Sequence, residues 1–194
     1  MALPIFYLVR HGETAWSLSG QHTGLSDIPL TANGEKHAAA LAGRLHGLNL
    51  KAVFTSPLQR ASKTCELAGF GSAMQIDPDL VEWNYGEYDG KTSAEIRAAR
   101  PDWSLFRDGC PGGETIDQVV ARADRVVQKI RVTQGDCLVF TSGHISRVLC
   151  VRWLGLPGNL GRYFMNGTAS VSMLGYEHTL TEPVVRLWNE SSRG

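Results

Sequence analysis

The sequence predicts an α/β protein, a three-layer sandwich in which helices cover both faces of a largely parallel sheet, with a possible antiparallel edge strand. Two observations support this class. Short apolar, β-rich runs alternate with segments of helical periodicity through most of the 194 residues. The runs are also continuously apolar, which is typical of strands buried on both faces rather than on one.

The first half of the chain is predicted to supply two strands and two helices. Leu3 to Val9 is an apolar run that ends directly at a polar segment, and Ala52 to Thr55 is a second, shorter strand. Between them, Thr31 caps a helix that runs to about Leu45. After the second strand, Ser56 caps a helix with Pro57 in its first position and Arg60 in its first turn.

The second half continues the alternation after an irregular middle. Thr92 and Glu95 have the spacing of a capping box, and Asp108 to Gly113 is a loop rich in glycine. The remaining elements are a helix from Thr115 with one apolar face, a buried strand from Cys137 to Thr141, a helix from Ile145 to Leu154 closed by Gly155, and a hairpin formed by Ser170 to Leu174 and Val184 to Trp188.

Composition narrows the classes of partner. The nineteen basic and nineteen acidic residues cancel, which argues against nucleic acid or an anionic membrane as the main partner. No apolar run approaches the roughly 20 residues of a membrane span, so we expect a cytoplasmic protein. We expect one domain over residues 1–194, with an irregular segment at about 83–114 that caps the substrate. The four cysteines lack metal-ligand spacing and are interpreted as free thiols.

Three predicted strands end in polar residues. Arg10 and His11 follow the first strand, Ser56 to Arg60 the second, and Ser142 to His144 the third. In open α/β sheets, ligands bind beyond the carboxyl ends of the strands, so these groups should converge. Guanidinium groups match phosphate oxygens bidentately and stay charged, and a neutral imidazole among them would be a nucleophile. The convergence predicts a phosphate site.

The same residues carry a resemblance to a known family. The run from Arg10 to Trp16 (Arg-His-Gly-Glu-Thr-Ala-Trp) resembles the signature of the histidine phosphatase superfamily, the phosphoglycerate-mutase-like proteins. The similarity covers nearly the whole chain, because further matching segments follow in the family's order: Gly20 to Gly24, Leu30-Thr31 with Gly34-Glu35, Thr55 to Pro57 with Arg60, and Glu82 with Tyr85-Gly86.

The resemblance implies a role for each matching residue. His11 would attack phosphorus, while Arg10 and Arg60 would hold the phosphoryl oxygens. Glu82 would protonate the leaving alkoxide and then deprotonate the hydrolytic water. The substrate pocket would be completed by Ser17, where many relatives carry asparagine, and by Gln21, Thr23, Gly24 and Tyr85.

One position departs from the family pattern. Relatives usually carry a second histidine after the third buried strand, where this chain has Ser142. His144 lies two residues further on, and if the chain stays extended there, both side chains point to the same side. Our hypothesis is that His144 completes the phosphate pocket; the alternative is a pocket with one histidine and weakened phosphate binding. We interpret His22, His37, His46 and His178 as solvated or satisfied residues without a role in the site.

The resemblance favours hydrolysis over mutase chemistry, because the chain lacks the long basic insertion of cofactor-dependent mutases. The segments around Trp83, Trp103 and Phe106 are most similar to the sugar-bisphosphatase and acid-phosphatase branch, which implies a small phosphorylated metabolite such as a sugar phosphate or bisphosphate, with Arg107 near a second phosphate. A phosphoglycerate mutase, and a pseudo-phosphatase that binds phosphorylated ligands without turnover, remain alternatives. We expect no metal or other cofactor, and an exposed edge of the late hairpin would allow a homodimer.

Overall fold

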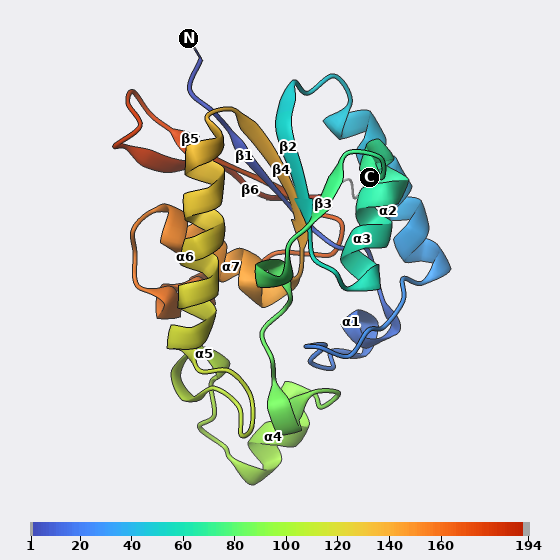
Figure 1. Ribbon diagram of the computed structural model, residues 1–194. Helices are drawn as coiled ribbons and strands as arrows, with labels where there is room; N and C mark the ends of the chain where they lie inside the picture. The colour runs from blue at the N-terminus through green and yellow to red at the C-terminus, as the bar shows by residue number, and fades with distance from the viewer. Residues whose placement is uncertain (1, 192–194) are drawn as a thin grey trace.

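A six-stranded sheet forms the middle layer of the protein (Figure 1). The computed structural model describes residues 2–191. The strand order is β3-β2-β4-β1-β5-β6; the first four strands are parallel, and β5 and β6 form an antiparallel edge, as the sequence predicts. The strands are β1 (Phe6–Arg10), β2 (Leu50–Thr55), β3 (Met74–Ile76), β4 (Asp136–Thr141), β5 (Val171–Tyr176) and β6 (Pro183–Glu190).

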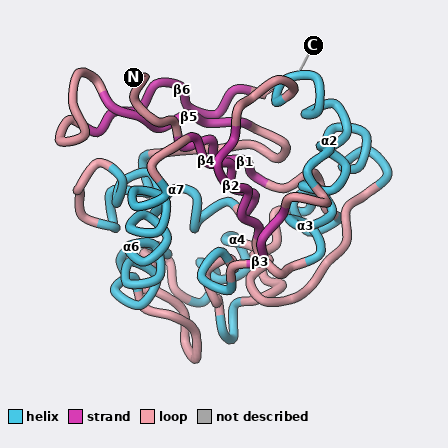
Figure 2. The backbone as a smooth tube through the Cα atoms, turned by 45° about the horizontal axis from the view of Figure 1, so that its top comes forward, coloured by secondary structure: helices cyan, strands magenta, loops and turns pink. Residues whose placement is uncertain are grey.

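Helices cover both faces of this sheet (Figure 2). Helices α2 and α3 lie on one face, and α6 and α7 lie on the other. Shorter helices and turns connect these layers. The helices are α1 (Ala15–Ser19), α2 (Ala32–Leu45), α3 (Gln59–Cys65), α4 (Ser93–Ala99), α5 (Leu105–Asp108), α6 (Ile116–Thr133) and α7 (Gly143–Trp153), with a π-helical turn η1 (Glu66–Phe70) and 3₁₀ turns η2 (Pro78–Leu80), η3 (Gly86–Tyr88) and η4 (Gly158–Tyr163).

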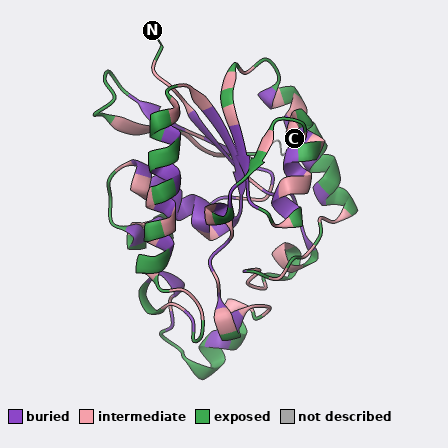
Figure 3. Ribbon diagram, in the orientation of Figure 1, coloured by how far each residue is buried: buried purple, intermediate pink, exposed green. Residues whose placement is uncertain are grey.

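The central strands are buried on both faces, which explains their continuous apolar runs (Figure 3). In β1, Phe6 and Leu8 pack with α6 and α7, whereas Tyr7 and Val9 pack with α2. Strand β4 alternates in the same way. Two hydrophobic cores therefore form, one on each side of a single sheet, and together they fix the positions of the strand ends.

The strand register brings three chain segments to one edge of the sheet. Arg10 at the end of β1 lies opposite Thr141 at the end of β4, and Phe140 of β4 lies opposite Thr55 at the end of β2. The polar segments that follow these strands are thus neighbours in space. Helices α4 and α5, within the irregular segment at 83–114, lie beyond this edge (Figure 1). That this segment caps a substrate stays a prediction.

Two predicted helix starts are wrong. Ser56 does not cap α3, because the helix begins at Gln59, whose backbone N–H donates to Asp27 Oδ1 at 2.8 Å. A carboxylate from a distant loop thus replaces the local cap, and Ser56 Oγ instead accepts from the N–H of Leu58. Helix α7 begins at Gly143, not at Ile145. His144 is therefore helical, and the extended geometry that we assumed for it is wrong.

Candidate active site

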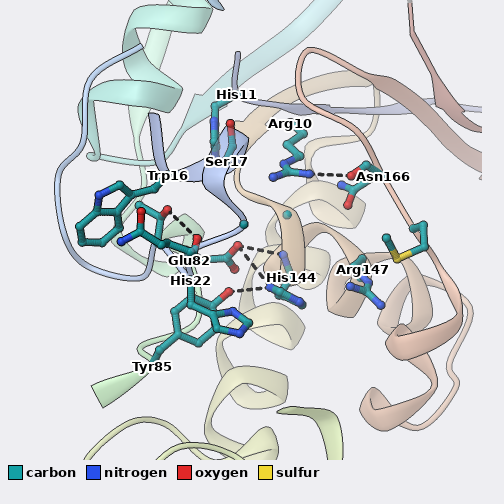
Figure 4. A pocket seen from close by; sticks show the side chains of 15 residues that line it. Arg10, His11, Trp16, Ser17, His22, Glu82, Tyr85, His144, Arg147 and Asn166 are labelled. Carbon is teal, nitrogen blue, oxygen red and sulfur yellow. Dashed lines mark hydrogen bonds and ion pairs between the residues drawn. The ribbon is translucent and has the colours of Figure 1, made fainter. Parts of the chain in front are cut away.

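A cavity of about 200 Å³ opens beyond the carboxyl ends of β1 and β4 (Figure 4). His11 and Arg10 lie at one end of it, and His22, Tyr85 and His144 lie at the other, with Glu82 between them. The cavity is lined by Arg10, His11, Trp16, Ser17, Gly20, Gln21, His22, Thr23, Glu82, Tyr85, Gly143, His144, Arg147, Met165 and Asn166. Most of the residues predicted for the site therefore share one pocket.

His11 is held in one tautomer. Its Nδ1 lies 2.7 Å from the carbonyl oxygen of Gly12, and because a carbonyl oxygen can only accept, Nδ1 carries the proton. Burial, with the charges of Arg60 and Arg10 adding to it, lowers the pKa of His11 well below its ordinary value of 6.5. The imidazole is therefore neutral at physiological pH, and Nε2 keeps its lone pair.

The loop that carries His11 is locked against the start of α2. Thr31 Oγ1 donates to Glu13 Oε1 at 2.6 Å, and the Thr31 N–H donates to the Glu13 carbonyl at 2.9 Å. A Cβ atom on Gly34 would lie 2.1 Å from that carbonyl oxygen, so only glycine permits this contact. Thr31 is also the N-cap of α2, as predicted, and accepts from the Gly34 N–H.

The two arginines of the predicted phosphate site have different surroundings. Arg10 lines the cavity; its Nη1 donates to the Asn166 carbonyl at 2.6 Å, while its buried Nε has no hydrogen-bond partner within residues 2–191. Arg60 is fully buried behind the cavity, where it donates to the carbonyl oxygens of Thr23, Gly24 and Ser26. Arg60 thus fixes the loop at 23–26 and contributes charge rather than lining the pocket.

Glu82 caps helix α7 from outside the helix. Its Oε2 accepts from the His144 N–H at 2.9 Å, and Oε1 accepts from the N–H groups of Ile145 and Trp83 at 2.8 and 2.9 Å. Ser142, the N-cap residue of α7, makes no capping bond, and its buried Oγ has no partner in the described chain. The positive end of α7 therefore holds the Glu82 carboxylate in the pocket.

The segment that carries Glu82 is braced by an ion pair between Arg122 of α6 and Glu114. Arg122 Nε and Nη2 donate to the two carboxylate oxygens at 2.7 and 2.9 Å. Arg122 also donates to the carbonyl oxygens of Asp79 and Val81, and Glu114 Oε2 accepts from the Asn84 N–H. The brace thus holds the chain on both sides of Glu82.

His144 reaches the cavity from the first turn of α7. Its Nδ1 lies 2.6 Å from the hydroxyl oxygen of Tyr85 and 3.9 Å from Glu82 Oε2. Its ring packs near those of Phe106 and His22, with centroids 5.7 and 6.0 Å away. His144 therefore lies beside Glu82, on the opposite side from His11 (Figure 4).

The remaining predicted residues divide between the cavity and its surroundings. Ser17, Gln21 and Thr23 line the cavity, and Gln21 Nε2 donates to the Gly90 carbonyl at 2.7 Å. Gly24 lies behind the lining, because its N–H donates to Asp89 and a Cβ atom would meet the Trp83 carbonyl at 2.8 Å.

Ser142 and Arg107 do not line the cavity. Ser142 is buried behind it. Arg107 is exposed on α5, where it pairs with Asp108 and donates to the carbonyl of Asp102. Neither residue is therefore positioned to contact a ligand in this cavity.

Sequence reasoning missed several lining residues. His22, interpreted as solvated or satisfied, lines the cavity and packs on Tyr85 with ring centroids 4.9 Å apart. Its position between Gln21 and Thr23, both assigned to the pocket, was an available signal. Arg147 follows His144 by one helical turn, so the correct start of α7 would have predicted it. Asn166 and Met165 come from an irregular loop whose sequence gives no signal.

The pocket combines the chemical groups that the sequence predicts for an enzyme site that binds phosphate. A neutral buried imidazole, the Arg10 guanidinium and a carboxylate converge beyond the ends of parallel strands. Comparison with known proteins leads to the same class. Residues 6–191 match the model of the histidine phosphatase superfamily (branch 1). The chain belongs to this superfamily.

Two of the similar proteins are named as phosphatases. An acid phosphatase of Mycobacterium tuberculosis is 40% identical over 183 residues, which cover 92% of this chain and 89% of that protein. A sedoheptulose 1,7-bisphosphatase of Saccharomyces cerevisiae is 35% identical over 79% of this chain and 68% of its own length. A solved structure of a Mycobacterium tuberculosis open reading frame product superposes with a TM-score of 0.91 at 36% identity, covering 97% of this chain and 98% of that one. These findings confirm the predicted class, a phosphoric monoester hydrolase.

Proposed function

We propose that this protein hydrolyses small phosphomonoesters, such as sugar phosphates, through a phosphohistidine on His11. The observation that carries the proposal is the bond from His11 Nδ1 to the Gly12 carbonyl, which leaves Nε2 unprotonated beside Arg10. An imidazole held in that tautomer next to the Arg10 guanidinium is arranged to attack a phosphate ester in line.

The first half-reaction transfers the phosphoryl group. His11 Nε2 attacks phosphorus, the bond to the ester oxygen breaks, and that oxygen leaves with the proton of Glu82. Arg10 donates to the phosphoryl oxygens, and Arg60 adds positive potential from behind the loop that it fixes. Glu82 Oε2 accepts a single backbone hydrogen bond and therefore keeps a site for this proton.

The second half-reaction returns the site to its starting state. The Glu82 carboxylate takes a proton from water, the water oxygen attacks the phosphorus of phosphohistidine, and the bond to Nε2 breaks to release inorganic phosphate. All of the positive charge in this scheme comes from arginine. Within residues 2–191 no cluster of His, Cys, Asp or Glu has the form of a metal site, and metal independence remains a prediction that an assay with a chelator would test.

A trapping experiment tests the proposal. Phosphate-labelled p-nitrophenyl phosphate is mixed with the enzyme, quenched in alkali within the first turnover, and the protein-bound label is mapped. We expect label on His11 that is stable to base and lost in acid, no label in His11→Asn, and steady release of inorganic phosphate from the parent protein.

Two outcomes would contradict the proposal. Binding of inorganic phosphate by a parent protein that neither acquires label on His11 nor releases phosphate from the ester would indicate a pseudo-phosphatase. A parent protein that acts only by interconverting phosphoglycerates, with 2,3-bisphosphoglycerate required, would indicate the mutase alternative.

A further inference from the structure

The end of the pocket away from His11 is polar but carries no free charge. His22, Tyr85 and His144 form this end (Figure 4). His22 Nε2 lies 3.2 Å from Ser93 Oγ, and the Tyr85 hydroxyl lies 2.6 Å from His144 Nδ1. We call these three residues the leaving-group subsite, because in the proposed reaction the phosphoryl group occupies the opposite end.

All three residues are neutral near physiological pH. Burial lowers the pKa of His22, lowers that of His144 well below its ordinary value, and raises that of Tyr85 well above it. Tyr85 keeps its proton and has no other hydrogen-bond partner among the described residues, so its hydroxyl donates to His144 Nδ1. His144 Nε2 then carries the imidazole proton and remains a neutral donor.

Among the described residues, the exposed arginines of the 83–114 segment do not line the pocket. Arg97, Arg100 and Arg107 are exposed and bonded outside the cavity, to Trp103, Tyr88 and Asp108. Within residues 2–191, the cations that line the cavity are Arg10 and Arg147.

The Arg147 guanidinium already forms hydrogen bonds with backbone carbonyl groups of the protein. Arg147 is 9% exposed, its Nε and Nη2 donate to the carbonyl oxygens of Gly161 and Arg162, and its guanidinium lies over the Phe106 ring at 4.9 Å. A second phosphate at this end would therefore lose its hydration without gaining a full set of charged donors, which is costly. A substrate hydroxyl group, by contrast, can form hydrogen bonds with the neutral side chains of this end, His22, Tyr85 and His144.

We propose that the leaving-group subsite selects monophosphates of uncharged, hydroxyl-bearing alcohols, such as sugar monophosphates, and discriminates against bisphosphates. The inference rests on the proposed function for the orientation of the substrate in the pocket. The sequence left sugar phosphates and sugar bisphosphates open as substrates, and the subsite favours the monophosphates. Arg107 then has no part in substrate recognition.

A matched substrate pair tests the inference. We would measure kcat/KM for glucose 6-phosphate and glucose 1,6-bisphosphate, with p-nitrophenyl phosphate as the baseline, and the Kd of both sugar ligands by calorimetry. The expected preference for the monophosphate is at least about tenfold, equivalent to about 1.4 kcal/mol. Equal or better use and binding of the bisphosphate would overturn the inference. If no compound were hydrolysed, the proposed function would fail, while the ratio of the two Kd values would still decide the inference.

Two variants locate the source of the selectivity. His144→Arg introduces a cation into the subsite and should shift the bisphosphate-to-monophosphate ratio of Kd values at least about tenfold toward the bisphosphate. His22→Lys serves the same purpose if the first variant does not fold. Arg107→Ala is the matched control, and its ratio should stay within about twofold of the parent, since Arg107 is exposed and ion-paired outside the cavity. A bisphosphate Kd that rises in Arg107→Ala, or a folded His144→Arg with an unchanged ratio, would overturn the assignment.

Discussion

The middle of the pocket, at Glu82, and its His11 end are held in different ways. Three backbone N–H groups donate to the Glu82 carboxylate, and the chain around it is fixed by the Arg122–Glu114 pair. At the His11 end, Arg10 makes one side-chain hydrogen bond among the described residues, from Nη1 to the Asn166 carbonyl, and the bond of His11 Nδ1 leaves Nε2 free. In the proposed mechanism this difference separates two tasks: the group that would move a proton is fixed by the protein, whereas the groups that would meet the phosphate keep bonding capacity for the ligand.

Replacing the fixed carboxylate should have the largest effect. Glu82→Gln keeps the shape of the side chain but cannot supply a proton to the leaving oxygen, so we expect kcat for an alkyl phosphate to fall about 10²–10⁴-fold. The loss should be much smaller for p-nitrophenyl phosphate, whose leaving group needs no proton. Steady-state kinetics on both substrates give the comparison. An equal loss on both would mean that Glu82 positions other groups rather than transferring a proton.

Removing the brace should have the next largest effect. Arg122→Ala leaves the mostly buried Glu114 carboxylate without its partner, and we expect the free energy of unfolding to fall by about 3 kcal/mol. Because the brace also holds the segment around Glu82, kcat should fall more for alkyl phosphates than for p-nitrophenyl phosphate. Urea unfolding and the same two assays measure both effects.

A conservative variant provides the control for the brace. Arg122→Lys keeps one charged bond and should recover part of both losses. Arg125 lies on the same helix as Arg122 and forms an exposed pair with Asp79 of η2. Arg125→Ala should therefore change the free energy of unfolding by less than about 1 kcal/mol. If Arg122→Ala lost stability but kept the parent ratio of the two activities, the brace would be structural only.

The buried strands and the antiparallel edge of the sheet were predictable, and the short edge strand β3 was not. Strands β1, β2 and β4 are buried on both faces, so their residues read as apolar runs, whereas β3 has three residues, two of them exposed, and leaves no pattern. Helix starts were predictable where the cap is local, as for Thr31, and not where Asp27 or Glu82 supplies the acceptor from a distant segment.

The candidate site shows the same limit. Side chains that directly follow a strand, such as Arg10 and His11, were predictable because the topology of a parallel sheet places strand ends together. Arg147 and Asn166 reach the cavity through tertiary packing of a helix and a loop. A local sequence pattern carries no information about such packing, so the shape of the pocket had to come from the structure.

The neutral imidazoles predict how stability depends on pH. Burial lowers the pKa of His11 and His144 well below 6.5 in the folded protein. Below pH 6.5 the unfolded chain binds protons at these residues that the folded chain does not, so folding becomes less favourable as the pH falls. Each imidazole should lower the free energy of unfolding by up to about 1.4 kcal/mol per pH unit, until its folded form is protonated.

Urea unfolding between about pH 7.5 and about pH 5.5 measures this slope. His11→Gln should reduce this slope by the contribution of one imidazole. If the slope were the same in His11→Gln and in the parent protein, His11 would not be the buried neutral imidazole that we infer. The same neutral form predicts that kcat/KM keeps its value to a pH below 6.5, since His11 remains the unprotonated nucleophile there.

The smallest effect should come from Ser142, at the position where relatives carry a second histidine. Because Glu82 caps α7, Ser142 Oγ is buried without a partner among residues 2–191, and an unbonded hydroxyl of this kind costs about 1 kcal/mol or more. Ser142→Ala should therefore raise the free energy of unfolding by about 1 kcal/mol. Ser146→Ala is the matched control one turn further along α7, because its Oγ donates to the Ser142 carbonyl at 2.6 Å and its loss should destabilise the protein. Inhibition by inorganic phosphate should be unchanged in Ser142→Ala, since the hydroxyl does not line the cavity. If phosphate inhibited Ser142→Ala more weakly than the parent protein, Ser142 would be a phosphate-binding residue after all. The groups that keep bonding capacity for the ligand would then include the residue at the start of α7.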